Sequence, residues 1–235
     1  MVKKAVCLIS GGLDSCATSH IAKNEGYDIF ALTFNYHQRH KREIESAKKI
    51  AASSNAKNHI IFNLDLSIFG GSSLVDKSNI PEKDQSLEEI GKKIPTTYVP
   101  ARNTIFLSIA LAYAETLDAD AIFIGATATD YSGYPDCRPE FIKAFQDLTN
   151  IATKKGVEGK TIKIIAPLLH MSKAEIIKKG LELKAPLDKT WSCYLGGDKA
   201  CGRCDSCLLR LKGFKEVGAR DPIQYEFLPI WYQSK

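Results

Sequence analysis

The amino-acid sequence predicts an α/β fold in which a mostly parallel five-stranded sheet carries helices on both faces. Short apolar runs recur along the chain, and segments with helical periodicity separate most of them. This alternation favours a parallel sheet, because each helix returns the chain to the end of the sheet where the previous strand began, so that the next strand runs in the same direction. With 235 residues, 44% of them hydrophobic, the chain can bury one substantial core.

The expected elements follow in chain order. Five apolar runs are the predicted strands, 5–9, 29–34, 59–62, 121–124 and 162–166. The predicted helices are 16–24, 41–53, 103–117, 140–155 and 173–183. Pro139 suits the first turn of the fourth helix, and Ser172 is the expected N-cap of the fifth, with Glu175 completing a capping box.

Two stretches of the chain lack this alternation. Periodicity fades over 65–100, which predicts a lid, a functional loop or a partly disordered segment. After about Leu187 a cysteine-rich segment begins. We therefore expect an α/β domain over 1–187, a metal-binding subdomain over 188–225 and a C-terminal tail over 226–235. The apolar residues of the tail are expected to pack against the body or a second subunit.

Composition narrows the class of protein. Lys and Arg number 32 against 27 Asp and Glu, a mild excess that suits anionic small molecules and falls short of a nucleic-acid footprint. No apolar run reaches the ~18 residues that a membrane helix needs, and the first run is too short for a signal-peptide core. We expect a soluble cytoplasmic protein without a membrane or nucleic-acid partner.

Four of the seven cysteines cluster near the C-terminus. Cys193, Cys201, Cys204 and Cys207 follow the pattern C-x7-C-x2-C-x2-C, in which two-residue spacers let neighbouring thiolates converge on one ion. Structural Zn²⁺ is the leading interpretation, because a closed four-thiolate site leaves no position for substrate. An iron–sulfur cluster is the alternative. Cys7 and Cys16, by contrast, are expected to be small buried side chains.

The run Ser10-Gly11-Gly12-Leu13-Asp14-Ser15 lies between the first predicted strand and the first predicted helix. The glycines allow close backbone approach to an anion, the serines add hydroxyl donors, and the helix N-terminus adds its dipole. Asp14 is expected to cap the helix or to help hold Mg²⁺. The run resembles the SGGxDS signature of the PP-loop ATP pyrophosphatases. That resemblance implies ATP as co-substrate, a Rossmann-like sheet of the adenine nucleotide alpha hydrolase type, and transfer of AMP to a substrate oxygen.

Three further segments narrow the family. They are Tyr36-His37-Gln38-Arg39-His40, Val99-Pro100-Ala101-Arg102-Asn103 and the polar, aromatic stretch 125–141, which contains DYSGYPDCRPEF. With the phosphate loop and the four cysteines, they resemble the 7-cyano-7-deazaguanine synthase (QueC) family of queuosine biosynthesis over about 5–225. Departures are small: Ala101 stands where glycine is expected, and 35–37 differ from the usual residues.

The resemblance implies a ligase that converts 7-carboxy-7-deazaguanine and ammonia into the nitrile. The carboxylate is first adenylated by ATP, and ammonia then displaces AMP to form an amide. A second activation of the amide oxygen allows its elimination. The resemblance also suggests a homodimer. The alternatives are a PP-loop tRNA-modifying enzyme such as a thiolase, which would need a more basic surface, and a non-enzymatic zinc module that binds nucleic acid.

Roles are assigned to individual residues in the same way. The loop Ser10–Ser15 is expected to hold the pyrophosphate end of ATP, and the candidates for neutralising charge during adenylyl transfer are Arg39, Arg102 and Lys173. The expected substrate-binding residues are Asp130, Tyr131, Ser132, Tyr134, Asp136 and Arg138. The two aspartates would accept hydrogen bonds from the deazaguanine, and a tyrosine would stack on it. The alternatives are that Lys173 is an ordinary surface lysine and that either tyrosine is a core residue. A covalent role for Cys137 is not favoured, since AMP already activates the carbon.

Overall fold

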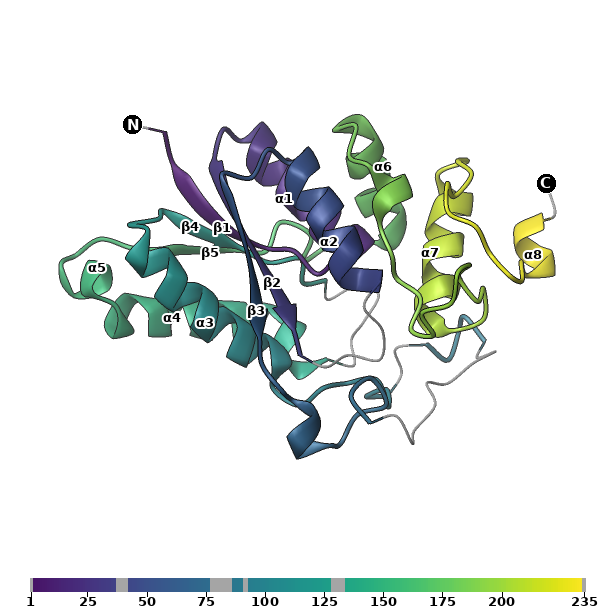
Figure 1. Ribbon diagram of the computed structural model, residues 1–235, viewed down its shortest axis with the longest axis horizontal. Coiled ribbons are helices and arrows are strands. Elements are labelled where there is room, and N and C mark those ends of the chain that lie inside the picture. Colours follow the sequence, from purple (N-terminus) through teal and green to yellow (C-terminus); the bar gives the residue numbers. More distant parts are fainter. Residues whose placement is uncertain (1, 37–41, 77–85, 91–92, 128–133, 234–235) are drawn as a thin grey trace.

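The computed structural model describes residues 2–36, 42–76, 86–90, 93–127 and 134–233. Its centre is a five-stranded sheet in the order β3-β2-β1-β4-β5, and every pairing is parallel (Figure 1). The strands are β1 (Lys4–Leu8), β2 (Asp28–Asn35), β3 (Asn58–Asn63), β4 (Ala121–Phe123) and β5 (Lys163–Ile165). The predicted fold class and all five predicted strands are confirmed, with ends that differ by at most one residue.

The helices occupy both faces of the sheet, as predicted (Figure 1). Six of them are α1 (Leu13–Asn24), α2 (Arg42–Ser53), α3 (Arg102–Thr116), α4 (Pro139–Ala152), α5 (Lys154–Val157) and α6 (Lys173–Glu182). The capping box at Ser172 is present, and Pro139 occupies the first turn of α4. The predicted helix 140–155 is instead divided at Thr153, whose extended backbone ends α4 and whose hydroxyl accepts a hydrogen bond from Gly156 N.

Strand β1 supplies side chains to both cores because its residues alternate between the faces. Val6 and Leu8 pack with the buried residues of α3 and α4. Ala5 and Cys7 pack on the opposite face with those of α1, α2 and α6. The central position of β1, buried on both sides, holds the turn that follows it between two layers of helices.

The segment 65–100 is anchored to the core where the structure describes it. It contains one short helical turn, η1 (Ser67–Phe69). Leu66, Val75 and Val99 are buried in the core on the α3 and α4 side of the sheet. Their burial ties these parts of the segment to the core, and the prediction of a lid, a functional loop or a partly disordered segment stays a prediction.

A helix that the sequence analysis did not predict, α7 (Asp205–Glu216), begins directly after Cys204. It packs on α6, and a Cβ at Gly213 would lie 2.7 Å from the Ile177 side chain. The tail forms α8 (Ile230–Gln233) and packs only partly, since the Tyr232 hydroxyl accepts a hydrogen bond from Asp221 N while Ile230 is 84% exposed. The predicted division at 187/188 stays a prediction. None of the described helices is long and apolar enough to cross a membrane.

A buried ion pair joins α7 to the segments on either side of it. Arg210 donates to both carboxylate oxygens of Asp221, at 2.7 and 2.9 Å, and the two side chains are 2% and 1% exposed. The same guanidinium donates to the Thr190 hydroxyl at 2.6 Å and to the Leu187 carbonyl at 3.1 Å. The Tyr225 hydroxyl donates to Asp221 at 2.7 Å. These bonds compensate both buried charges and hold the chain before α7 in place.

The turn from β1 into α1 is confined by backbone on two sides. Gly11 has a φ of +92°, and a Cβ there would lie 2.1 Å from the carbonyl oxygen of Glu43 on α2. On the other side, Trp191 N donates a hydrogen bond to the Gly11 carbonyl at 2.9 Å. Only glycine combines this backbone conformation with so close an approach.

Replacing Asp221 with Asn should leave the buried Arg210 charge uncompensated. We expect this variant to lose about 3 kcal/mol or more of unfolding free energy, measured by urea denaturation. The matched control is Glu216→Gln, which breaks the exposed Lys212–Glu216 pair at 3.7 Å on α7, the helix that carries Arg210. This control should lose less than about 1 kcal/mol of unfolding free energy. Equal losses in the two variants would contradict a central role for the buried pair.

Gly11→Ala should destabilise the protein by about 2–5 kcal/mol, because strain at positive φ adds to a steric clash with the α2 backbone. Gly26→Ala is the matched control, since Gly26 has a φ of +82° but nothing within 4 Å of the position that a Cβ would take there. That control should lose only the conformational part, about 1–2 kcal/mol. If Gly11→Ala were as stable as Gly26→Ala, the α2 backbone could move away from the added methyl group at little cost, which would contradict the confinement of this turn.

Candidate active site and metal centre

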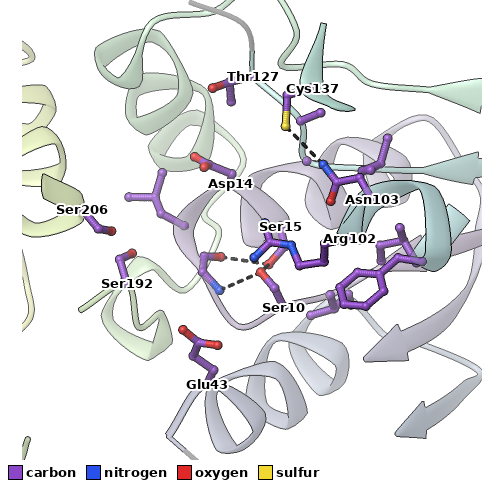
Figure 2. A pocket seen from close by; sticks show the side chains of 18 of the residues that line it. Ser10, Asp14, Ser15, Glu43, Arg102, Asn103, Thr127, Cys137, Ser192 and Ser206 are labelled. Carbon is purple, nitrogen blue, oxygen red and sulfur yellow. Dashed lines mark hydrogen bonds between the residues drawn. The ribbon is translucent and has the colours of Figure 1, made fainter. Parts of the chain in front are cut away.

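A pocket of about 270 Å³ lies at the carboxyl ends of the central strands. In an open parallel sheet, ligands bind beyond the carboxyl ends of two neighbouring strands whose following connections go to opposite faces of the sheet. In this sheet the two strands are β1 and β4. The polar lining residues of the pocket come from distant parts of the chain, and most of them are labelled in Figure 2. They include Ser10, Asp14, Ser15, Tyr36, Glu43, Arg102, Asn103, Thr127, Tyr134, Lys173, Ser192, Tyr194, Ser206 and Arg210.

The predicted phosphate loop forms one wall of this pocket (Figure 2). Ser10 Oγ accepts a hydrogen bond from Gly12 N at 3.4 Å and donates to Ser15 Oγ at 3.2 Å, and Ser15 Oγ donates to the Gly12 carbonyl at 3.0 Å. Helix α1 begins at Leu13, with no side-chain cap at Gly12 among the described residues. Its first N–H groups and the positive end of its dipole can therefore serve an anion.

Lys173 joins this wall from the N-terminus of α6. Its ammonium group contacts the Asp14 carboxylate at 2.7 and 2.9 Å, and its side chain is only 13% exposed. The structure therefore excludes the alternative of an ordinary surface lysine. The pair places a cation and a carboxylate beside the turn.

Arg102 enters the pocket at the start of α3. Ala101 before it adopts a left-handed backbone with a φ of +53°, which accounts for the glycine expected there. Arg102 donates to the Tyr36 hydroxyl at 3.5 Å. Burial raises the pKa of Tyr36 to about 12 despite the nearby Arg102 charge, so the phenol stays neutral. Tyr134 also lines the pocket, and its hydroxyl hydrogen-bonds to the Thr97 hydroxyl at 3.0 Å.

Asp136 instead serves the N-terminus of α3. Its Oδ2 accepts a hydrogen bond from Asn103 N at 2.8 Å, and its carbonyl accepts one from Asn103 Nδ2 at 3.0 Å. It does not line the pocket, and neither does the exposed Arg138, which directly precedes α4. Contacts of these two residues with substrate stay predictions. The predicted residues Arg39, Asp130, Tyr131 and Ser132 lie outside the described residues.

Cys137 lines the pocket as a thiol. Its sulfur accepts a hydrogen bond from Asn103 Nδ2 at 3.2 Å. Burial, with the nearby Asp136 charge, raises the pKa of Cys137 to about 11, against a weaker opposing effect of Arg102. Only the thiolate is an effective nucleophile, so this environment disfavours a covalent role.

Three residues that were not predicted as site residues also project toward the pocket: Glu43, Ser192 and Ser206 (Figure 2). Burial raises the pKa of Glu43 to about 7, and the Arg102 charge opposes that shift. In the sequence, Glu43 is one of several charged residues of the predicted helix 41–53. Its position in the first turn of that helix was the one signal that could have identified it. No local pattern marks either serine, since both reach the pocket only through the fold of the C-terminal segment.

The four predicted cysteine ligands do converge. The sulfur atoms of Cys193, Cys201, Cys204 and Cys207 lie within 4.8 Å of one another, and all four residues are buried. A tetrahedral Zn²⁺ with bonds of about 2.3 Å would separate its sulfurs by roughly 3.8 Å, and Cys201 and Cys207 lie 3.9 Å apart. The donor set therefore fits a tetrahedral thiophilic metal.

Backbone N–H groups also point at these sulfurs. Cys193 Sγ accepts from Leu195 N and Cys201 N, both at 3.4 Å, and Cys201 Sγ accepts from Arg203 N and Cys204 N at 3.4 and 3.3 Å. Such bonds stabilise thiolates, the form in which cysteine binds a metal. The surroundings thus suit a metal-bound cluster better than four free thiols.

The cysteine cluster is linked directly to the phosphate loop. Trp191 donates from its backbone to Gly11 and from its indole to the Cys193 carbonyl, at 2.9 and 3.0 Å. The Arg42 guanidinium stacks on the Trp191 ring at 3.9 Å and donates to the Gly197 carbonyl at 2.6 Å. The segment that carries the first cysteine therefore forms a wall of the pocket.

Comparison with known proteins agrees with this geometry. The family model of "Queuosine biosynthesis protein QueC" matches residues 4–218. A protein of Citrifermentans bemidjiense named 7-cyano-7-deazaguanine synthase is 55% identical over 97% of this chain and 100% of its own length. Proteins of the same name from Picrophilus torridus and Trichodesmium erythraeum are 54% and 53% identical, covering 98% and 94% of this chain and 95% and 99% of their own lengths. The chain belongs to the QueC family of queuosine biosynthesis proteins.

Proposed function

We propose that this protein is a 7-cyano-7-deazaguanine synthase, an ATP-dependent carbon–nitrogen ligase that makes the nitrile from 7-carboxy-7-deazaguanine and ammonia. The observation that carries the proposal is one pocket in which the SGGLDS turn, Lys173 and Arg102 surround the N-terminus of α1. Full-length identity of 53–55% to proteins of that name supports the substrate. A carboxylate is a poor electrophile, so its conversion to a nitrile needs the activation that such a pocket supplies.

In the proposed reaction the turn holds the phosphates of ATP. Backbone N–H groups at the start of α1 and the hydroxyls of Ser10 and Ser15 donate to phosphate oxygens. Lys173 and Arg102 stabilise the charge that develops when the substrate carboxylate attacks the α-phosphate and pyrophosphate leaves. Bound Mg²⁺ would neutralise part of the phosphate charge, with Asp14 as its nearest protein ligand. No enzyme nucleophile is required.

The aromatic part of the pocket suits a flat heterocycle. Phe34 and Phe106 stack with ring centroids 3.9 Å apart, and both line the pocket with Tyr134. Aromatic side chains in the wall of a pocket exclude water and can stack on a flat ligand. We assign this region to a purine-like ring. Contacts from Asp130, Tyr131, Ser132, Asp136 and Arg138 to the deazaguanine, and from Arg39 to phosphate, belong to the same proposal.

We assign Zn²⁺ to the cysteine cluster, as a structural ion. Four thiolates complete a tetrahedral shell, and the ion then has no open position for substrate. Its effect on catalysis would be indirect, since the cluster holds the segment from Trp191 to Tyr194 against the phosphate loop. A cytoplasmic location and a homodimer are proposed from the family alone.

The central assay supplies ATP, Mg²⁺, ammonium and 7-carboxy-7-deazaguanine and detects the nitrile, AMP and pyrophosphate by mass spectrometry. Lys173→Met should reduce turnover by about a hundredfold or more, because a cation aimed at developing charge is lost. Lys178→Met, an exposed position on the same helix, is the matched control and should leave turnover unchanged. Folded wild-type protein that yields no nitrile would refute the proposed function.

Metal analysis of protein purified without oxygen should find about one zinc ion per chain. Cys201→Ser should lose most of this zinc and melt at a lower temperature, since structural zinc contributes directly to folding. Cys16→Ala removes a buried thiol outside the cluster and should keep the zinc. Stoichiometric iron with acid-labile sulfide would instead establish the iron–sulfur alternative.

A further inference from the structure

Three polar side chains face the pocket between the phosphate loop and the cysteine cluster (Figure 2). Glu43 projects from the first turn of α2, Ser192 lies on the segment before Cys193, and Ser206 lies in the first turn of α7. Within the described part of the chain, none of these three side chains has a hydrogen-bond or ion-pair partner. They form an acceptor-rich corner of a pocket whose other charged side chains are Arg102, Arg210 and the Asp14–Lys173 pair.

Glu43 lies directly against the loop that holds ATP in the proposed function. Its carbonyl oxygen limits the space at Gly11, as described above. Glu43 is partly buried, and the burial raises its pKa by disfavouring the charged carboxylate. Asp14, the other carboxylate of the pocket, already contacts Lys173 at 2.7 Å. The Arg102 charge offsets part of the cost of burying the Glu43 carboxylate, and a bound cation or a proton would offset the rest.

The chemistry of the corner limits what that cation is. Mg²⁺ binds through several oxygen ligands in octahedral geometry, and one carboxylate with two hydroxyls offers few. An ammonium ion has four N–H donors and no acceptor, so one carboxylate and two hydroxyl oxygens can satisfy most of it. A charge-assisted hydrogen bond to the carboxylate would supply most of the attraction.

We propose that Glu43, with Ser192 and Ser206, binds the ammonium ion and accepts a proton from it, so that ammonia is released as a nucleophile beside the phosphate loop. This inference rests on the proposed function. It addresses a chemical requirement of that function, because ammonia is almost entirely protonated at neutral pH and ammonium has no lone pair with which to attack.

The step balances as follows in atoms and charge. Glu43 takes one proton from ammonium and leaves ammonia. The nitrogen lone pair forms the new N–C bond to the adenylated carboxyl carbon, and the C–O bond to AMP breaks, with AMP taking the electron pair. The nitrogen then loses a second proton to water, which leaves the neutral amide, and Glu43 returns its own proton to solvent.

The test compares Glu43→Gln with Glu45→Gln, an exposed residue of the same helix that pairs with Lys48. Steady-state kinetics would vary ammonium, ATP and 7-carboxy-7-deazaguanine separately. We expect Glu43→Gln to raise KM for ammonium at least about tenfold, because a charged hydrogen bond is lost, and to leave KM for ATP within about twofold of wild type. Ser206→Ala should raise KM for ammonium by about threefold, as expected for one neutral hydrogen bond.

Two further measurements isolate the ammonia step. Without ammonium, the burst of pyrophosphate from adenylation should be the same in Glu43→Gln as in wild type. Hydroxylamine, which is mostly unprotonated at neutral pH, should support hydroxamate formation in Glu43→Gln at close to the wild-type rate, because it needs no base to expose its lone pair.

Three outcomes would overturn the inference. In the first, Glu43→Gln matches Glu45→Gln in its KM for ammonium. In the second, the pyrophosphate burst falls as much as overall turnover does, which would assign Glu43 to ATP or its metal. In the third, hydroxylamine fails to restore turnover. If the wild type makes no nitrile from any nitrogen source, the proposed function itself fails, and this result is distinct from the other three.

Discussion

The confinement of Gly11 is the constraint on which the rest of the site depends. Its backbone lies against the Glu43 carbonyl of α2 on one side and accepts the hydrogen bond from Trp191 on the other. Because β1 is the central strand, the turn after it lies where the two helix layers and the C-terminal segment meet. A turn held in this way keeps its N–H groups aimed before a ligand arrives, so the proposed binding of phosphate would need little reorganisation.

Besides the two serines that it contributes to the pocket, the C-terminal segment acts on the site through structural contacts. The cysteine cluster holds the chain after Trp191, and the Arg210–Asp221 pair holds the chain before it, by way of Thr190 and Leu187. Arg42 adds a link from α2 through its stacking on Trp191. A metal ion without a substrate position can thus matter to catalysis, since its loss would release one wall of the pocket.

The fold was predictable because its signals are local. Apolar runs identify the five strands, and Ser172 with Glu175 marks the start of α6 through adjacent residues alone. The SGGLDS turn and the cysteine spacing are local in the same sense. Asp136 was not predictable as the hydrogen-bond partner of the α3 N-terminus, because its partner Asn103 is 33 residues away. Helix α7 was missed because the cysteines before it suggested a metal loop, and Glu43, Ser192 and Ser206 meet only through tertiary packing.

The central claim is that the substrate carboxylate itself attacks the α-phosphate of ATP and that the same pocket repeats this attack with the amide oxygen. Mass spectrometry of AMP formed from 7-carboxy-7-deazaguanine labelled at both carboxyl oxygens with a heavy isotope tests it most directly. The account predicts two AMP molecules per nitrile, each carrying one labelled oxygen, with unlabelled pyrophosphate. Unlabelled AMP, or ADP with labelled phosphate, would contradict it.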